Sequence, residues 1–309
     1  MAYVLETFNL SKRYKKQWAL KDVNIHISKG DIYGFVGENG SGKTTVIRLV
    51  TGLISATEGG LALFGVKNDN PAILEERKKV GAIVETPSIY LNMSAAENLR
   101  LQSSILGIVE DVEEKIKGVL AEVGLLAVYE DKKKASNFSL GMRQRLGIAM
   151  ALLGNPELII LDEPMNGLDP TGIVEIRELI LKLNREKEIT FLISSHILSE
   201  LSLVATKYGI ISKGKLLTEI TAEELTQQCR PSISINVADP EALKNLLVAY
   251  LPPEDCSFAE WGARVYGVAN LNDLLKKIID AGIEILNVNS HQANIESYYL
   301  SLVGGMQHA

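Results

Sequence analysis

The sequence predicts an α/β protein: a parallel sheet with an antiparallel β subdomain and a helical insert, followed by a small α+β domain. Three observations support this fold class. A buried strand at 31–36 runs into a glycine-rich loop and then into a helix. Two later apolar runs, at 158–163 and 189–196, each end in polar side chains. After about residue 220 the pattern changes to short alternating strands and helices.

Length and composition fit two unequal globular domains. The 309 residues are 46% hydrophobic and 23% charged, which is ordinary for a protein with a substantial core. We expect the first domain at 1–220, with the helical insert at about 88–155, and the second at 221–309. The net charge of −6 argues against a nucleic-acid-binding surface.

Several features bear on the compartment. The N-terminal residues lack the basic and apolar blocks of a signal peptide, and no run of about 18 apolar residues occurs. The two cysteines, Cys229 and Cys256, fit a reducing compartment and show no metal-ligand spacing. We therefore expect a chain that has no transmembrane segment of its own.

The first strands are expected at 4–10 and 19–27, where side chains alternate as in an antiparallel sheet. The next strand, at 31–36, is followed by a loop in which two glycines bracket four residues before a lysine and a threonine. This is the phosphate-binding loop pattern, and its residues are Gly37, Glu38, Asn39, Gly40, Ser41, Gly42, Lys43, Thr44 and Thr45.

The chemistry of this loop follows from its residue types. Glycines allow a tight turn that directs backbone N–H groups at phosphate oxygens, and the start of the next helix adds its positive end. Lys43 would reach the β- and γ-phosphates, and Thr44 would bind Mg²⁺. The loop alone predicts only a nucleoside triphosphate, so a kinase, a GTPase and a transporter subunit all remain open.

Tyr14 lies just upstream of the loop and is flanked by lysine and arginine side chains. An aromatic ring in this position could stack on a purine base. Alternatively, Tyr14 is an exposed side chain on a hairpin, and its position alone does not decide between the two interpretations.

The helical insert follows a short strand at 80–84 that ends at Glu85. Residues 94–126 predict helices, the first of which begins with a capping box formed by Ser94 and Glu97. The insert separates two parts of one parallel sheet.

The insert ends with a second candidate anion site. We interpret the basic run at 132–134 as a solvated face. Ser139 is expected to cap a helix that runs to Leu153. A helix start that carries Ser139 and Gly141 can bind an anion.

Two carboxylates end the apolar run at 158–163, which is typical of a central parallel strand. The carboxyl ends of such strands lie where α/β sheets bind ligands. Because adjacent side chains on a strand point to opposite faces, one carboxylate can face a metal ion and the other a water molecule. We assign Asp162 to the metal and Glu163 as the candidate general base. The alternative is a charged strand end that is merely solvated.

The strand at 189–196 repeats this design and ends in His196. A single histidine is more often structural. At the tip of a strand parallel to the one that carries Asp162, it is expected to reach the same phosphate. A further strand at 207–217, with a turn at 212–214, closes the first domain.

With these motifs in order, the chain resembles the ATPase subunit of an ATP-binding cassette (ABC) transporter. The motifs that support this are the phosphate loop, Ser139-Leu140-Gly141, the strand at 158–163, Gly167-Leu168-Asp169 and His196. Residues 83–87, 138–142 and 298–305 further resemble the bacitracin- and lantibiotic-resistance type of exporter.

The resemblance implies a role for each motif. Tyr14 would stack on adenine, Thr44 and Asp162 would hold Mg²⁺, Glu163 would polarise the attacking water, and His196 would contact the γ-phosphate. Asp169 would lie at the contact between two ATPase subunits, whereas Ser139 and Gly141 would complete the site of the opposite subunit. ATP and Mg²⁺ are thus the expected ligands.

Two departures from the usual family pattern stand out. Glu85 occupies the position of the usual glutamine; it can still bind Mg²⁺ or water, but it adds negative charge beside the phosphates. In the motif that usually reads Leu-Ser-Gly-Gly-Gln, Leu140 and Met142 replace a glycine and the glutamine. Gly141, whose backbone must approach phosphate, is retained.

The resemblance also implies the partners. A homodimer or heterodimer of ATPase subunits would sandwich two ATP molecules and drive a separate integral-membrane permease, at the cytoplasmic face of the membrane. The exporter type implies export of a peptide antibiotic or a related amphiphile. The alternative is a soluble ABC ATPase in nucleic-acid or translation processes, but the chain lacks the zinc cysteines and long coiled coil of such proteins.

The remainder, at 221–309, predicts a small domain of ferredoxin-like order. Strands are expected at 232–237, 264–268 and 283–288, and the final helix at 295–302. No catalytic constellation occurs in this part of the sequence.

Overall fold

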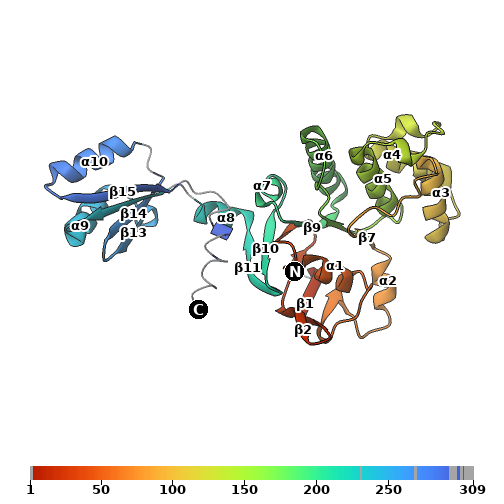
Figure 1. Ribbon diagram of the computed structural model, residues 1–309, viewed down its shortest axis with the longest axis horizontal. Helices are drawn as coiled ribbons and strands as arrows, with labels where there is room; N and C mark the ends of the chain where they lie inside the picture. Colours follow the sequence, from red (N-terminus) through yellow and green to blue (C-terminus); the bar gives the residue numbers. More distant parts are fainter. Residues whose placement is uncertain (1–2, 230–231, 268–269, 292–297, 300–301, 303–309) are drawn as a thin grey trace. The chain divides into compact units, whose positions relative to one another are not determined.

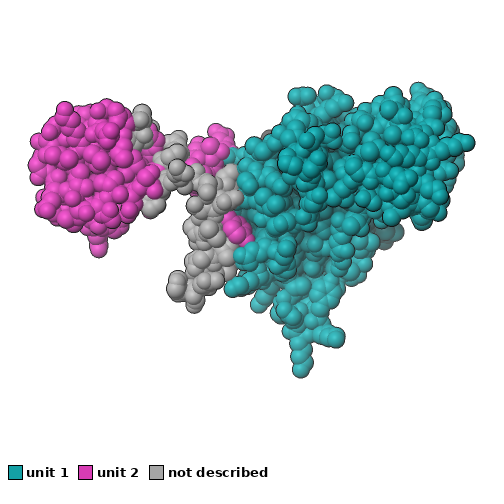
Figure 2. Space-filling view, turned by 45° about the horizontal axis from the view of Figure 1, so that its top comes forward, with its two compact units in different colours: residues 1–222 teal, residues 223–309 magenta. Residues whose placement is uncertain are grey.

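The computed structural model describes residues 3–229, 232–267, 270–291, 298–299 and 302. The chain divides into two compact units, Met1–Ala222 and Glu223–Ala309, which Figure 2 shows in different colours. The described residues form three sheets, two of them in the first unit. Within these residues, no helix combines the length and the apolar character needed to cross a bilayer.

The sheet that carries the site has the strand order β11-β10-β4-β9-β8-β7 within the described residues. Figure 1 labels β7, β9, β10 and β11 of this sheet. Its strands are β4 (Ile32–Val36), β7 (Val80–Ile83), β8 (Leu158–Asp162), β9 (Thr190–Ser195), β10 (Lys207–Ser212) and β11 (Lys215–Thr221). Its neighbouring strands are parallel, except in the β10–β11 hairpin. Because parallel strands end at one edge, the segments that follow β4, β7, β8 and β9 meet there.

Strands β4, β8 and β9 are buried along their whole length, as expected for parallel strands that are covered on both faces. The helices that connect the strands are α1 (Lys43–Val50), α2 (Ile73–Arg77), α6 (Pro170–Lys187) and α7 (Leu198–Leu201). Asp169 caps α6 by accepting a hydrogen bond of 3.1 Å from the Gly172 N–H, and Pro170 occupies the first helical position.

The antiparallel subdomain pairs β1 (Tyr3–Tyr14), β2 (Gln17–Val23), β3 (His26–Ser28), β5 (Glu58–Leu63) and β6 (Val66–Lys67). β1 is longer than the predicted strand at 4–10, because it continues through register shifts into the hairpin with β2. One hydrophobic core joins this subdomain to the parallel sheet: Leu10 and Leu20 belong to the same buried cluster as Ile160 and Leu192.

The insert contains α3 (Ala95–Ile105), α4 (Val112–Glu122), η1 (Leu126–Val128), η2 (Ala135–Asn137) and α5 (Leu140–Leu152). The predicted capping box is confirmed, since Ser94 and Glu97 exchange side-chain-to-backbone hydrogen bonds. The predicted helical region at 94–126 breaks after α3, where Gly107 has φ +72° and Asp111 has φ +51°.

The second unit contains α8 (Ala222–Gln228), β12 (Ser232–Val237), α9 (Pro240–Tyr250), η3 (Pro253–Asp255), β13 (Cys256–Ala259), β14 (Gly262–Tyr266), α10 (Leu271–Asp280) and β15 (Ile285–His291). The order of its sheet, β13-β14-β12-β15, matches the predicted ferredoxin-like order. Most of the helix predicted at 295–302 lies outside the described residues.

Candidate functional site

The phosphate loop turns sharply between β4 and α1, where two of its glycines leave no room for a side chain. A Cβ at Gly37 would lie 2.4 Å from the carbonyl oxygen of Ile211. Gly42 has φ +114°, and a Cβ there would lie 2.6 Å from Leu20. α1 begins directly after Gly42, and no side chain among the described residues caps it. The N–H groups of its first turn are therefore available to an anion.

Lys43 folds back over the loop. It is only 5% exposed, and its Nζ donates to the carbonyl oxygens of Gly37 at 2.6 Å and Glu38 at 3.2 Å. Nearby, the hydroxyl of Ser41 is buried without a partner among the described residues. A phosphate in the loop would give Nζ a stronger, charge-assisted partner than two carbonyls.

Asp162 is 2% exposed at the end of β8 and is held from two sides. Thr44 Oγ1 donates to its Oδ2 at 2.9 Å, and Ser194 Oγ donates to its Oδ1 at 2.5 Å. The structure thus brings Thr44 and Asp162 together, and their oxygens are the ligand type that Mg²⁺ prefers in such loops. The contribution of Ser194 was not predicted; a polar residue at the tip of an apolar strand was the only signal.

Glu163 lies between His196 and Lys43, the two other residues for which the sequence predicts a catalytic role. Its Oε2 lies 2.7 Å from His196 Nδ1, and its Oε1 lies 3.4 Å from Lys43 Nζ. Its backbone has φ +50°, which is uncommon outside glycine, and its N–H donates to Ser194 Oγ at 3.0 Å. A carboxylate fixed in this way beside an imidazole and an ammonium group suits a general base.

Glu200 is a further residue near the site that the sequence did not indicate. It lines a small cavity together with Glu163 and His196. Burial raises the pKa of Glu200, although the nearby His196 acts to lower it. The sequence offered only a glutamate a few residues after the histidine, and this is common on helix surfaces.

Two cavities that share Ala19 and Gly40 connect the phosphate loop to Tyr14. The first, of about 210 Å³, is lined by the loop and by Glu163. The second, of about 440 Å³, is lined by Tyr14, Trp18 and Lys213, among others. A nucleotide with its phosphates in the first cavity would place its base in the second. Tyr14 is 44% exposed there, so the structure is compatible with either interpretation of this residue.

Glu85 lies at the same edge of the sheet, just after β7, and forms an ion pair with Arg48. No hydrogen bond or ion pair among the described residues joins Glu85 to Thr44 or Asp162. The structure therefore gives Glu85 a partner that the sequence did not suggest.

Ser139, Gly141 and Asp169 lie at the starts of two helices, α5 and α6. Ser139 caps α5 by accepting a hydrogen bond from the Met142 N–H at 3.1 Å, as predicted. The two motifs approach each other, since a Cβ at Gly141 would meet the Leu168 side chain at 3.9 Å. No hydrogen bond or ion pair in the described part of the chain links these three residues to the phosphate loop.

One edge of the sheet carries a loop shaped for phosphate, an oxygen pair suited to Mg²⁺ and a candidate general base. Together they suit one kind of chemistry, the attack of water on a terminal phosphate. The fold and this edge therefore define a phosphate-loop nucleoside triphosphatase.

Comparison with known proteins narrows the class. The family profile described as "ABC transporter" matches residues 20–166. The chain is 42% identical over 307 residues to the bacitracin transport ATP-binding protein BcrA of Bacillus licheniformis, covering 99% of each chain. It is 43% identical over 216 residues to the lantibiotic transport ATP-binding protein SrtF of Streptococcus pyogenes, covering 70% of this chain and 90% of SrtF. This chain belongs to the ABC transporter ATP-binding proteins.

A solved structure of an ATP-binding subunit of an ABC transporter is also similar to this chain. It is 30% identical, has a TM-score of 0.63, and covers 73% of this chain and 92% of its own. The predicted fold class, the resemblance and the ATPase activity are thereby confirmed. The alternative of a nucleic-acid or translation ATPase receives no support.

Proposed function

We propose that this chain drives export of a peptide antibiotic or a related amphiphile through a separate integral-membrane permease, at the cytoplasmic face of the membrane. The observation that carries the proposal is the extent of the similarity to BcrA, which spans both units of the chain. The match to SrtF covers only 70% of the chain and so carries the proposal less far.

At the nucleotide, we assign the triphosphate to the loop and the adenine to Tyr14. Thr44 and Asp162 would hold Mg²⁺, which supplies charge neutralisation at the β- and γ-phosphates when it is bound. Glu163 would take the proton of the attacking water, and His196 would hold Glu163 and approach the γ-phosphate.

We further propose that two ATPase subunits, in a homodimer or a heterodimer, sandwich two nucleotides. The supporting feature is the surface that carries Ser139, Gly141 and Asp169. It contains the start of α5, where Ser139 accepts from one of the first N–H groups and the others can still face an anion. Among the described residues, no hydrogen bond or ion pair links this surface to the phosphate loop of its own chain. A site that lacks these groups is complete only when a second subunit supplies them.

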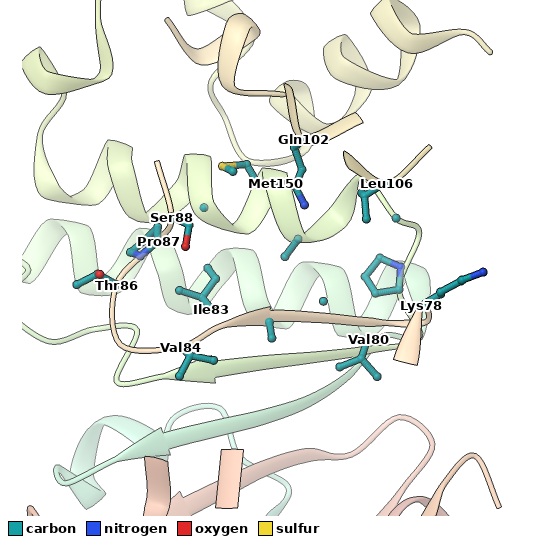
Figure 3. A pocket seen from close by; sticks show the side chains of 16 residues that line it. Lys78, Val80, Ile83, Val84, Thr86, Pro87, Ser88, Gln102, Leu106 and Met150 are labelled. Carbon is teal, nitrogen blue, oxygen red and sulfur yellow. The ribbon is translucent and has the colours of Figure 1, made fainter. Parts of the chain in front are cut away.

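The permease is proposed to dock on residues 88–91. A cavity of about 260 Å³ adjoins this segment, between β7 on one side and α3 and α5 on the other. Figure 3 shows Pro87 and Ser88 at one end of it, with Gln102 and Met150 projecting from the helices. Tyr90 and Leu91 are 51% and 47% exposed, so about half of each residue's surface is accessible to a partner.

Replacing Tyr90 by alanine is expected to weaken permease binding by roughly 30-fold, the scale of about 2 kcal/mol for a buried aromatic anchor in an interface. The ATPase rate of the isolated chain should not change, because the buried Asn98 holds the Tyr90 backbone through both its N–H and its carbonyl. Pull-down of the permease measures the effect, with Tyr250→Ala, which removes another exposed tyrosine, as control. Unchanged binding and transport in Tyr90→Ala would rule out this docking site.

The export proposal is tested by antibiotic susceptibility. Cells that express this chain with its permease should tolerate a peptide antibiotic such as bacitracin better than cells that express the Glu163→Gln variant with the same permease. Tolerance to an antibiotic with a cytoplasmic target serves as control and should be equal in both strains. Equal susceptibility to a panel of membrane-active peptide antibiotics would overturn the assignment of the transported substance.

A further inference from the structure

Arg48 and Glu85 form an ion pair that joins the phosphate-loop helix to the end of β7. Arg48 lies one helical turn after Thr44 on α1, so both side chains project from the same face of the helix. Glu85 follows β7, whose Ile83 pairs with Leu161 on the neighbouring strand β8. Glu85 and Glu163 therefore occupy equivalent places beyond the ends of adjacent parallel strands.

The backbone holds Glu85 in an unusual conformation. Its φ is +65°, and the Thr86 N–H donates to the carbonyl oxygen of Val84 at 2.8 Å. These two features describe a γ-turn with Glu85 at its centre, a turn that is rare and strained for a residue with a side chain. Such strain persists where the surroundings fix it, and it is concentrated at functional sites.

The pair also has a clear electrostatic consequence. A carboxylate at this sheet edge adds negative charge where a triphosphate must bind, and like charges disfavour each other. The guanidinium of Arg48 compensates that charge. The two side chains are 41% and 59% exposed, and a pair this exposed is weak enough to open and re-form as the site fills.

We propose that Arg48 is a positioning residue that neutralises Glu85 and fixes it at the sheet edge that carries the proposed nucleotide site. The proposal rests on the proposed function, in which this edge of the sheet binds ATP. A neutral glutamine at position 85 needs no counter-ion. Arg48 is therefore required for nucleotide binding only when residue 85 is an acid. An arginine that merely stabilised the fold would be required whichever residue occupied position 85.

The test is a double-mutant cycle on the isolated full-length chain, with KM for MgATP and kcat measured separately. Arg48→Ala is expected to raise KM about fivefold, the scale of one partly exposed ion pair, with little change in kcat. Arg48→Lys, which keeps the charge, should recover most of the loss. In the Arg48→Ala/Glu85→Gln protein, KM should return to within about twofold of the Glu85→Gln single variant.

A matched control is Arg100→Ala. Arg100 pairs with Glu113 on the insert, and these side chains are 46% and 48% exposed, close to the values for Arg48 and Glu85. Its removal should not change KM. Thermal unfolding of each variant shows that it is folded.

Two results would overturn the proposal. One is an unchanged KM when Arg48→Ala is made in the otherwise unaltered chain. The other is the same fold-increase in KM from Arg48→Ala whether residue 85 is glutamate or glutamine. Neither result depends on which substance is transported. The antibiotic-susceptibility test described above addresses that question separately.

Discussion

Replacing Glu163 by glutamine should reduce ATP hydrolysis by on the order of 10²-fold or more while nucleotide binding is retained, because the change removes a general base and leaves the volume of the side chain nearly unchanged. Asp162 keeps its contacts in this variant, since Thr44 and Ser194, not Glu163, hold its carboxylate. Lys43 loses the charge of Glu163 but keeps its hydrogen bonds to the carbonyl oxygens of Gly37 and Glu38. Phosphate release under saturating ATP measures the hydrolysis rate, and a fluorescent ATP analogue measures binding.

The control for this substitution lies next to the same strand. Glu157 is an exposed glutamate just before β8, at the opposite end from Glu163. Glu157→Gln should hydrolyse ATP at the unaltered rate. If Glu163→Gln did the same, Glu163 would be removed from the mechanism, and the base would then be sought at Glu85 or through His196.

The Glu163→Gln variant also reports on the proposed sandwich. If loss of the γ-phosphate opens the proposed dimer, a slow variant should remain dimeric with ATP in size-exclusion chromatography. A slow variant that stays monomeric would retain the chemistry but contradict a sandwich formed by this chain alone. A dimer that needs the permease or a different ATPase subunit would then be indicated.

Most of the site could be predicted from the sequence because its parts are local. Gly37 and Gly42 lie within one loop whose shape their spacing sets, and Asp162 and Glu163 end one apolar strand. The parallel order of the strands then brings these segments to one edge of the sheet. The type of each residue and its place at a strand end were sufficient to predict which residues meet at this edge.

The contacts that could not be predicted join distant segments. Ser194 and Asp162 are 32 residues apart, and Arg48 and Glu85 are 37 residues apart. Periodic patterns in a sequence come from apolar side chains that are buried on one face of a helix or strand. A serine hydroxyl or an exposed guanidinium belongs to no such pattern, so its partner cannot be predicted in this way. The sequence therefore identified Glu85 as a departure from the family pattern but could not show which cation compensates it.

Replacing Lys43 by alanine should weaken ATP binding by about 10²-fold. The Nζ of Lys43 donates to two loop carbonyls and faces Glu163, so a bound triphosphate would exchange these partners for phosphate oxygens. A hydrogen bond between charged groups contributes about 1.5–3 kcal/mol, and roughly 3 kcal/mol corresponds to about 10²-fold in affinity. Hydrolysis should fall at least as far, because weak binding and the lost charge act together.

The matched control is Lys182→Ala, which removes an exposed lysine from α6 and should leave affinity unchanged. Thermal unfolding with and without MgATP separates binding from folding. Wild-type protein should gain stability on adding nucleotide, and Lys43→Ala should gain little, because a ligand stabilises only in proportion to its occupancy. A Lys43→Ala protein with full nucleotide stabilisation would show that the loop backbone and the start of α1 bind the triphosphate without this lysine.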